Sequence, residues 1–161
     1  FTWFLGHLGR TYSAGEFVSA RRTWNNVGRS FSDFFRKYDL YLTPVTATPA
    51  FKVGELKFKT AEHILMTIVN YLKLGSLIKA SGAITRLAEA NMVKFPFTQI
   101  ANMAGLPAMS VPLHWTEIGL PVGTQFIGRF GDEATLFRLA AQLEKEKPWF
   151  DKRPVLYPRL P

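Results

Sequence analysis

The clearest pattern of apolar positions predicts a long amphipathic helix in the first quarter of the chain. Seven apolar side chains recur three or four positions apart: Phe17, Ala20, Trp24, Val27, Phe31, Phe34 and Tyr38. This spacing places them on one stripe of a helix, and we expect such a stripe to be buried. Ser13 and Glu16 form a capping-box pattern, which predicts that the helix begins near Ala14.

Short apolar runs bounded by turn residues predict three strands. These runs lie at residues 39–44, 108–114 and 120–128. A turn at residues 116–119 joins the second and third runs, so these two are expected to form an antiparallel pair. A sheet of about three strands is smaller than usual, and we expect it to be the edge portion of a larger one.

Further helices are predicted around this sheet. They lie at residues 60–74, near residues 83–91, at residues 97–104 and after Asp132, which is expected to cap the last helix. Gly105 is expected to end the third of them in the left-handed conformation. In the last, Leu136, Leu139, Ala140 and Leu143 are predicted to face inward. The pattern therefore predicts an α/β fold in which a small mixed β-sheet packs with helices, as a single domain over residues 1–161.

The composition is that of a folded chain without disulfides. Of its 161 residues, 47% are hydrophobic and 20% charged, and none is cysteine. We therefore expect a reducing, cytoplasmic location. The longest apolar stretch, residues 64–74, is shorter than the ~18 residues that a membrane span requires, so no membrane association is expected. Because the chain begins at Phe1 rather than Met, we expect it to be a segment of a longer polypeptide.

The net charge of +8 permits a second hypothesis, a basic and non-enzymatic module that binds RNA or another anionic partner. The basic residues are scattered along the chain, however, and no recognition motif accompanies them. We therefore do not expect a dedicated nucleic-acid surface. Binding that weakens steeply with salt would favour this alternative.

Most catalytic patterns are missing from the sequence. There is no Gly-x-Ser-x-Gly elbow, Gly-x-Gly-x-x-Gly fingerprint or phosphate-binding loop. Ser76 and Lys79 match Ser-x-x-Lys, a spacing in which the amine could deprotonate the hydroxyl, but the companion segments are absent and a helix end is the favoured interpretation. His7, His63 and His114 lack the spacing of metal ligands. We predict no catalytic residue, metal site or cofactor in this chain.

Three stretches resemble the C-terminal part of amidase signature enzymes. They are residues 38–50 (YDLYLTPVTATPA), residues 97–112 (FTQIANMAGLPAMSVP) and residues 119–128 (GLPVGTQFIG). The resemblance implies a family that cleaves carboxylic amides, or transfers their ammonia, through an acyl-enzyme on a serine that a second serine and a lysine activate. In that family these groups lie in an N-terminal region with a Gly- and Ser-rich signature, which this chain lacks.

The resemblance further implies that this chain completes a large sheet and forms one side of a substrate cleft. Its candidate substrate-binding residues are Thr43, Phe95, Thr98 and Asn102. Thr98 and Asn102 offer a hydroxyl and an amide for polar contacts. For Asn102 the favoured alternative is that its side chain holds the turn at Gly105.

Phe95 departs from part of the family pattern. Members that read a charged amine tend to carry an acid three residues before the matching threonine, here Thr98. An apolar residue disfavours a component of a tRNA-dependent amidotransferase and favours a hydrolase of uncharged small-molecule amides, with the 6-aminohexanoate cyclic dimer hydrolase type as one candidate. The expected partners are the missing N-terminal catalytic region and, for the severed segment, further copies of itself.

Overall fold

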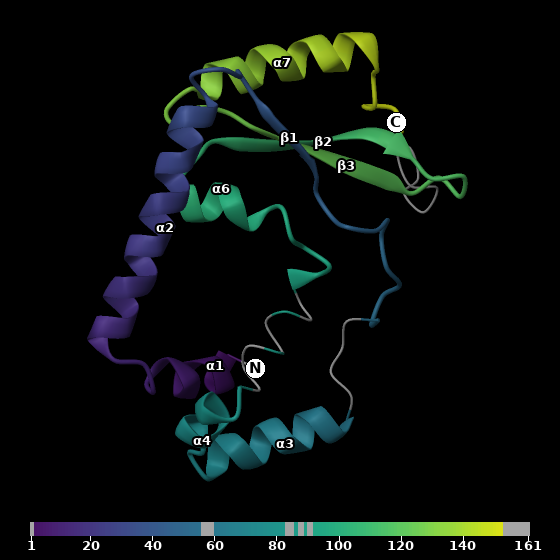
Figure 1. Cartoon of the computed structure of the whole chain (residues 1–161). Coiled ribbons are helices and arrows are strands. Elements are labelled where there is room, and N and C mark those ends of the chain that lie inside the picture. The colour runs from purple at the N-terminus through teal and green to yellow at the C-terminus, as the bar shows by residue number, and fades with distance from the viewer. Residues whose placement is uncertain (1, 56–59, 83–85, 87–88, 90–91, 153–161) are drawn as a thin grey trace.

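The fold contains a small sheet with helices on both faces and a separate helical group at the far end of a long helix (Figure 1). The computed structural model of the chain describes residues 2–55, 60–82, 86, 89 and 92–152. The helical piece predicted near residues 83–91 lies mostly outside the described residues. Among the helices that are described, none is both long and apolar enough to cross a membrane.

The sheet has the three strands that the sequence predicts. They are β1 (Tyr41–Pro44), β2 (Ala108–Trp115) and β3 (Pro121–Ile127), in the spatial order β1-β3-β2. The hairpin between β2 and β3 is confirmed, and its turn is closed by the Gly119 N–H, which donates to the Thr116 carbonyl over 2.8 Å. Both pairings within the described chain are antiparallel. The α/β class and the small sheet are therefore confirmed, with antiparallel rather than mixed pairing in this part.

Helix α7 (Glu133–Glu146) covers one face of the sheet (Figure 1). Its N-cap is Asp132, as predicted, whose carboxylate accepts from the backbone N–H of Thr135 over 3.3 Å. The Thr135 hydroxyl also donates to this carboxylate and lowers the pKa of Asp132. Leu136 is buried against Val111 and Phe126 of the sheet, which confirms the predicted inward face of the helix.

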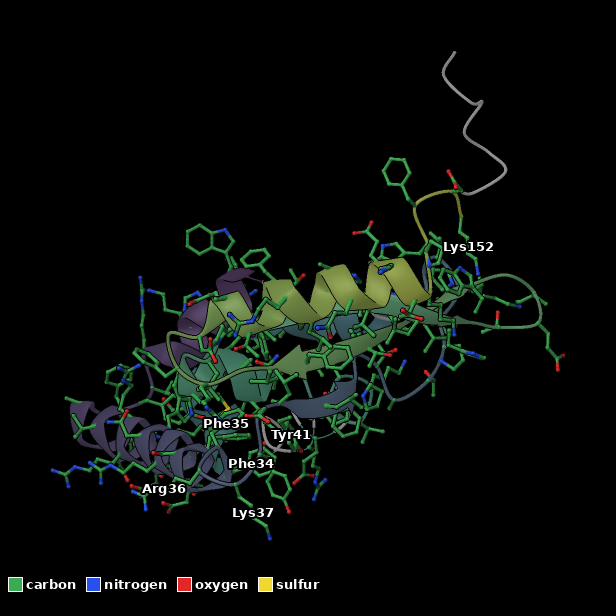
Figure 2. The ribbon with its side chains drawn as sticks, turned by 90° about the horizontal axis from the view of Figure 1, so that it is seen from above. Phe34, Phe35, Arg36, Lys37, Tyr41 and Lys152 are labelled. Carbon is green, nitrogen blue, oxygen red and sulfur yellow. The ribbon has the colours of Figure 1, made fainter. Side chains whose placement is uncertain are left out.

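The opposite face of the sheet meets the C-terminal end of α2 (Ala14–Phe34) and the short helix α6 (Gln99–Ala104). Ile127 is fully buried there against Phe35 and Ala101. Figure 2 shows the rings of Phe34, Phe35 and Tyr41 gathered at this junction, where the Phe34 centroid lies 5.3 Å from that of Phe35 and 5.5 Å from that of Tyr41. Aromatic pairs at such distances anchor one element on another.

Gly105 ends α6 as predicted. Its φ of 67° is the left-handed conformation that glycine adopts without a steric penalty. The Leu106 N–H then donates to the Ala101 carbonyl over 3.0 Å and closes the turn. This turn leads the chain directly from α6 into β2.

A third group of helices lies at the other end of α2. It consists of α1 (Thr2–Gly9), α3 (Thr60–Tyr71) and α4 (Gly75–Ala80), packed around Phe4, Leu8 and Val69. Helix α3 begins where the sequence predicts, whereas α1 and α4 are additional to the predicted helices. The sequence predicts a helix over residues 60–74, and α3 ends at Tyr71. Gly75 is the first residue of α4, and its backbone passes close to α1. A Cβ at this position would lie 3.1 Å from the His7 carbonyl oxygen.

The long helix α2 confirms one prediction and contradicts another. It begins at Ala14 after a complete capping box between Ser13 and Glu16. The predicted burial of its apolar stripe is wrong for the N-terminal part, where Phe17 is 65% exposed and Trp24 41%. Phe31 and Phe34 pack on the core as expected, and Tyr38, beyond the end of α2, is 47% exposed. Periodicity shows that a helix has an apolar face but not what covers that face. Here the C-terminal end of α2 packs on the sheet, while the face at its N-terminal end is left open.

Candidate functional site

Thr43, the first predicted site residue, lies in β1 on the face of the sheet that α7 does not cover. It pairs with Gln125 of β3, and Gln125 pairs in turn with Ser110 of β2. Residues directly opposite each other on antiparallel strands share a face. Their neighbours Val111 and Phe126 point to the α7 side, so Thr43, Gln125 and Ser110 form a polar row on the other side.

The inner members of this row are buried without polar partners. Thr43 is 4% exposed and Gln125 is 6% exposed, whereas Ser110 is exposed. Neither Thr43 Oγ1 nor Gln125 Nε2 has a hydrogen-bond partner among the described residues. Most buried polar groups in proteins are paired, so two unpaired groups side by side call for an explanation.

One side of the row is closed by Val45. Gly123 lies two residues before Gln125 and so points to the same face. A Cβ on Gly123 would lie 2.8 Å from Val45 Cγ2 and 3.0 Å from Ser110 Oγ. Only glycine fits between these side chains. Val45 and Ser110 therefore lie on either side of Gly123 in β3, next to Gln125. Ser110 forms the solvent-exposed end of the polar row.

The structure brings the segment after Thr43 together with Phe95. The Ala47 N–H donates to the Lys94 carbonyl over 3.1 Å and ties the two segments together. The rings of Phe51 and Phe95 meet edge to face, with centroids 5.8 Å apart. Residues 45–51 and 94–95 therefore form one continuous wall, in which the Phe95 ring is partly buried.

Thr98 and Asn102 lie on the helix that follows this wall. Thr98 is the N-cap of α6, but its side chain makes no capping hydrogen bond. Asn102 lies within α6, and it is exposed. The turn at Gly105, which the alternative assigns to Asn102, is closed by the backbone hydrogen bond from the Leu106 N–H to the Ala101 carbonyl.

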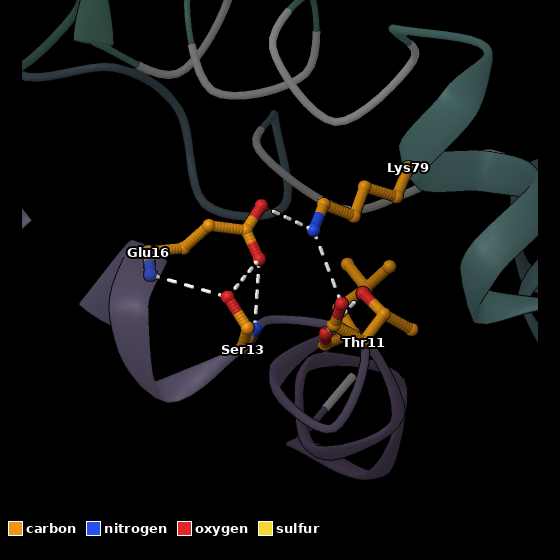
Figure 3. A network of polar contacts seen from close by, with 5 residues as sticks. Thr11, Ser13, Glu16 and Lys79 are labelled. Atoms are coloured by element: carbon orange, nitrogen blue, oxygen red, sulfur yellow. Dashed lines mark hydrogen bonds and ion pairs between the residues drawn. The ribbon is translucent and has the colours of Figure 1, made fainter. Parts of the chain in front are cut away.

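The Ser-x-x-Lys match does not assemble a nucleophile and base. Both residues lie in α4, but the Lys79 ammonium points to the start of α2 (Figure 3). It lies 2.5 Å from Glu16 Oε1 and 3.1 Å from the Thr11 carbonyl oxygen, over the ring of Tyr12. Lys79 therefore clamps the third helical group to the capping box of α2.

This clamp predicts a dependence of stability on pH. The hydrogen bond from Lys79, with those from Ser13, lowers the pKa of Glu16 from 4.5 to about 2. A carboxylate with a lowered pKa stabilises the fold fully above its ordinary pKa, and this contribution is lost as pH falls from about 4.5 towards 2. We expect thermal unfolding midpoints to fall over this range, and to fall less steeply in Lys79→Met. If the unfolding midpoints of the parent chain and Lys79→Met fall equally with pH, the stabilising contact between Lys79 and Glu16 is contradicted.

Two other features of the described surface are accounted for without a reactive site. Among the residues that the structure describes, no group of three or more His, Asp or Glu is placed to hold a metal ion. A hollow of about 220 Å³ beside α2 is lined in part by Arg36 and Arg129. Arg36 lies 3.7 Å from Asp33, and Arg129 lies 2.7 Å from Asp39. Both cations thus have anionic partners within the chain.

Gln125 is a candidate site residue that sequence reasoning does not find. It lies within the segment at residues 119–128 that carries the family resemblance, yet its position in a predicted strand does not show which face it occupies. The register of three strands is needed to place it beside Thr43. Alternation along β3 indicates only that Gln125 and Ile127 share a face.

Comparison with known proteins agrees with this architecture. The amidase family profile matches residues 2–137. The chain is 31% identical over 149 residues to a glutamyl-tRNA(Gln) amidotransferase component of Geobacillus kaustophilus, covering 92% of this chain and 25% of that protein. It is also 31% identical over 150 residues to a fatty acid amide hydrolase of Medicago truncatula, covering 93% of this chain and 21% of the relative.

A solved structure shows the same fold. The 6-aminohexanoate cyclic dimer hydrolase in complex with its substrate superposes with a TM-score of 0.61 at 24% identity, covering 89% of this chain and 27% of that one. The chain therefore belongs to the amidase family. It spans about a quarter of the length of the curated relatives it matches.

Proposed function

We propose that this chain is the C-terminal region of an amidase-family hydrolase that cleaves carboxylic amide bonds through an acyl-serine intermediate. The observation that carries the proposal is the family match over residues 2–137 in a chain about a quarter as long as its relatives. The two serines and the lysine of the family belong to the N-terminal region. This chain contributes strands to the common sheet and one wall of the substrate cleft.

The reaction forms and breaks one bond at a time. The serine oxygen adds to the amide carbonyl carbon while its proton passes to the base. The C–N bond then breaks, and the leaving amine takes up a proton, so that an ester to the serine remains. Water adds to this ester, and the carboxylic acid and the free serine are released. Lys79 takes no part, because it is held by Glu16 and Thr11.

The wall formed by Phe51 and Phe95 favours an uncharged substrate. The two rings present apolar surface, which suits an aliphatic or aryl group next to the scissile amide. The Lys94 ammonium lies 6.0 Å from the Phe51 ring centroid, and this positive charge repels a cationic substrate. These contacts support hydrolysis of neutral amides over recognition of a substrate ammonium group.

A direct test compares the chain alone with the same chain in one polypeptide with its upstream region. We expect the chain alone to show no turnover of simple amides and no mass change with a serine-directed fluorophosphonate probe. The longer polypeptide is expected to hydrolyse amides and to gain the mass of one probe. Robust turnover or labelling of the chain alone would overturn the proposal, as would a longer polypeptide that is folded but inactive towards every amide.

A further inference from the structure

Two polar atoms side by side on the sheet are buried without partners among the described residues. Thr43 Oγ1 and Gln125 Nε2 belong to directly paired residues of β1 and β3, each more than nine-tenths buried. Leaving a polar group unpaired in the interior destabilises the folded chain. A ligand that pairs with both groups would remove this cost.

The two groups share the ability to donate a hydrogen bond. The side-chain nitrogen of Gln125 is a donor only, and the Thr43 hydroxyl both donates and accepts. Their complement is therefore an oxygen acceptor. Thr43, Gln125 and Ser110 are all uncharged, which matches a neutral carbonyl better than an anion.

We propose that Thr43 and Gln125 form a binding site for the carbonyl oxygen of an amide group. The amide enters from the exposed Ser110 end, since Val45 packs against Gly123 on the same face. The site leads into the wall described above, because Thr43 precedes the segment that Ala47 ties to Lys94. The assignment of this amide to a substrate rests on the proposed function. The ability of Thr43 and Gln125 to bind a carbonyl oxygen does not depend on it.

The first experiment measures the stability of the chain without ligand. Thr43→Val and Gln125→Met remove the unpaired polar atoms but keep the approximate volume. Each is expected to raise the folding equilibrium constant, by about tenfold, because a buried unsatisfied group is lost. Thr124→Val, on the opposite face of β3, is the matched control and should give no such gain. Destabilisation by Thr43→Val and Gln125→Met would show that the two groups are already paired in solution and would overturn the proposal.

The second experiment titrates the chain with two small amides and follows its amide and side-chain signals by NMR. Benzamide represents a substrate carboxamide, and N-methylacetamide represents a peptide group from another part of a polypeptide. We expect saturable shifts at Thr43 and Gln125 that Thr43→Val and Gln125→Met abolish and Thr124→Val preserves. Absence of saturable shifts, or equal shifts in all variants, overturns the site.

The two amides distinguish the source of the carbonyl. Tighter binding of benzamide supports a substrate amide, whereas tighter or equal binding of N-methylacetamide supports a peptide group. The result is also separable from the proposed function. A longer polypeptide without amidase activity would refute that function. The NMR shifts and the stability gains test the binding site independently of that activity.

Discussion

In the longer polypeptide, Phe95→Asp is expected to shift substrate preference towards amides that carry an ammonium group. The pair to compare is 6-aminohexanamide and heptanamide, which differ in a terminal ammonium against a methyl group. A carboxylate at position 95 would lie beside the partly buried Phe51 ring and could pair with the substrate ammonium. A hydrogen bond to a charged group contributes about 1.5–3 kcal/mol, so the ratio of kcat/KM for the two amides should rise about 10- to 100-fold.

Phe95→Leu is the matched control for this prediction. It keeps an apolar wall of smaller size, and the ratio of the two kcat/KM values should stay close to that of the parent. Circular dichroism of both variants separates loss of folding from loss of recognition. A folded Phe95→Asp protein with an unchanged ratio would show that Phe95 does not contact the substrate, and would remove it from the cleft wall.

The sequence predicts those elements that are determined by local chemistry. The capping box at Ser13 and Glu16, the N-cap at Asp132 and the glycine at position 105 each act within one turn of a helix. The hairpin between β2 and β3 is local in the same sense, because a short turn joins two alternating runs. These features need no knowledge of the rest of the fold, and the structure confirms each of them.

Features that depend on contacts between distant segments cannot be predicted in the same way. The sequence does not show that Gly75 lies against α1, where a Cβ would come within 3.1 Å of the His7 carbonyl oxygen. The predicted burial of the α2 stripe rests on its period alone. Whether such a stripe is covered depends on a partner that periodicity does not identify.

The candidate site shows the same limit. Thr43 and Phe95 follow from the family resemblance, and the structure connects their segments through Ala47 and Lys94. Gln125 escapes sequence reasoning because its relation to Thr43 is a matter of strand register, which a single strand does not reveal. The unpaired state of both side chains is a property of the folded chain and has no signal in the sequence.

The exposed stripe of α2 is expected to drive self-association of the chain when it is alone. Phe17 and Trp24 are exposed on one face of a helix whose other end is anchored to the sheet. Burying a large apolar side chain contributes about 1.5–3 kcal/mol when the burial is complete. Because these two are already partly covered, we expect Phe17→Gln with Trp24→Gln to raise the dissociation constant about 10- to 100-fold in sedimentation equilibrium.

Phe137→Gln on α7 is the control that distinguishes association through the α2 stripe from nonspecific hydrophobic association. Phe137 is more exposed than Phe17, at 75% against 65%, but it projects from the helix whose inner face is already packed on the sheet. Its replacement should leave the dissociation constant unchanged if association proceeds through α2. A parent chain that stays monomeric at all concentrations would contradict the prediction. Equal effects of the α2 and α7 variants on the dissociation constant would also contradict the prediction. Any exposed aromatic side chain would then support association, and the α2 stripe would not be a specific contact surface.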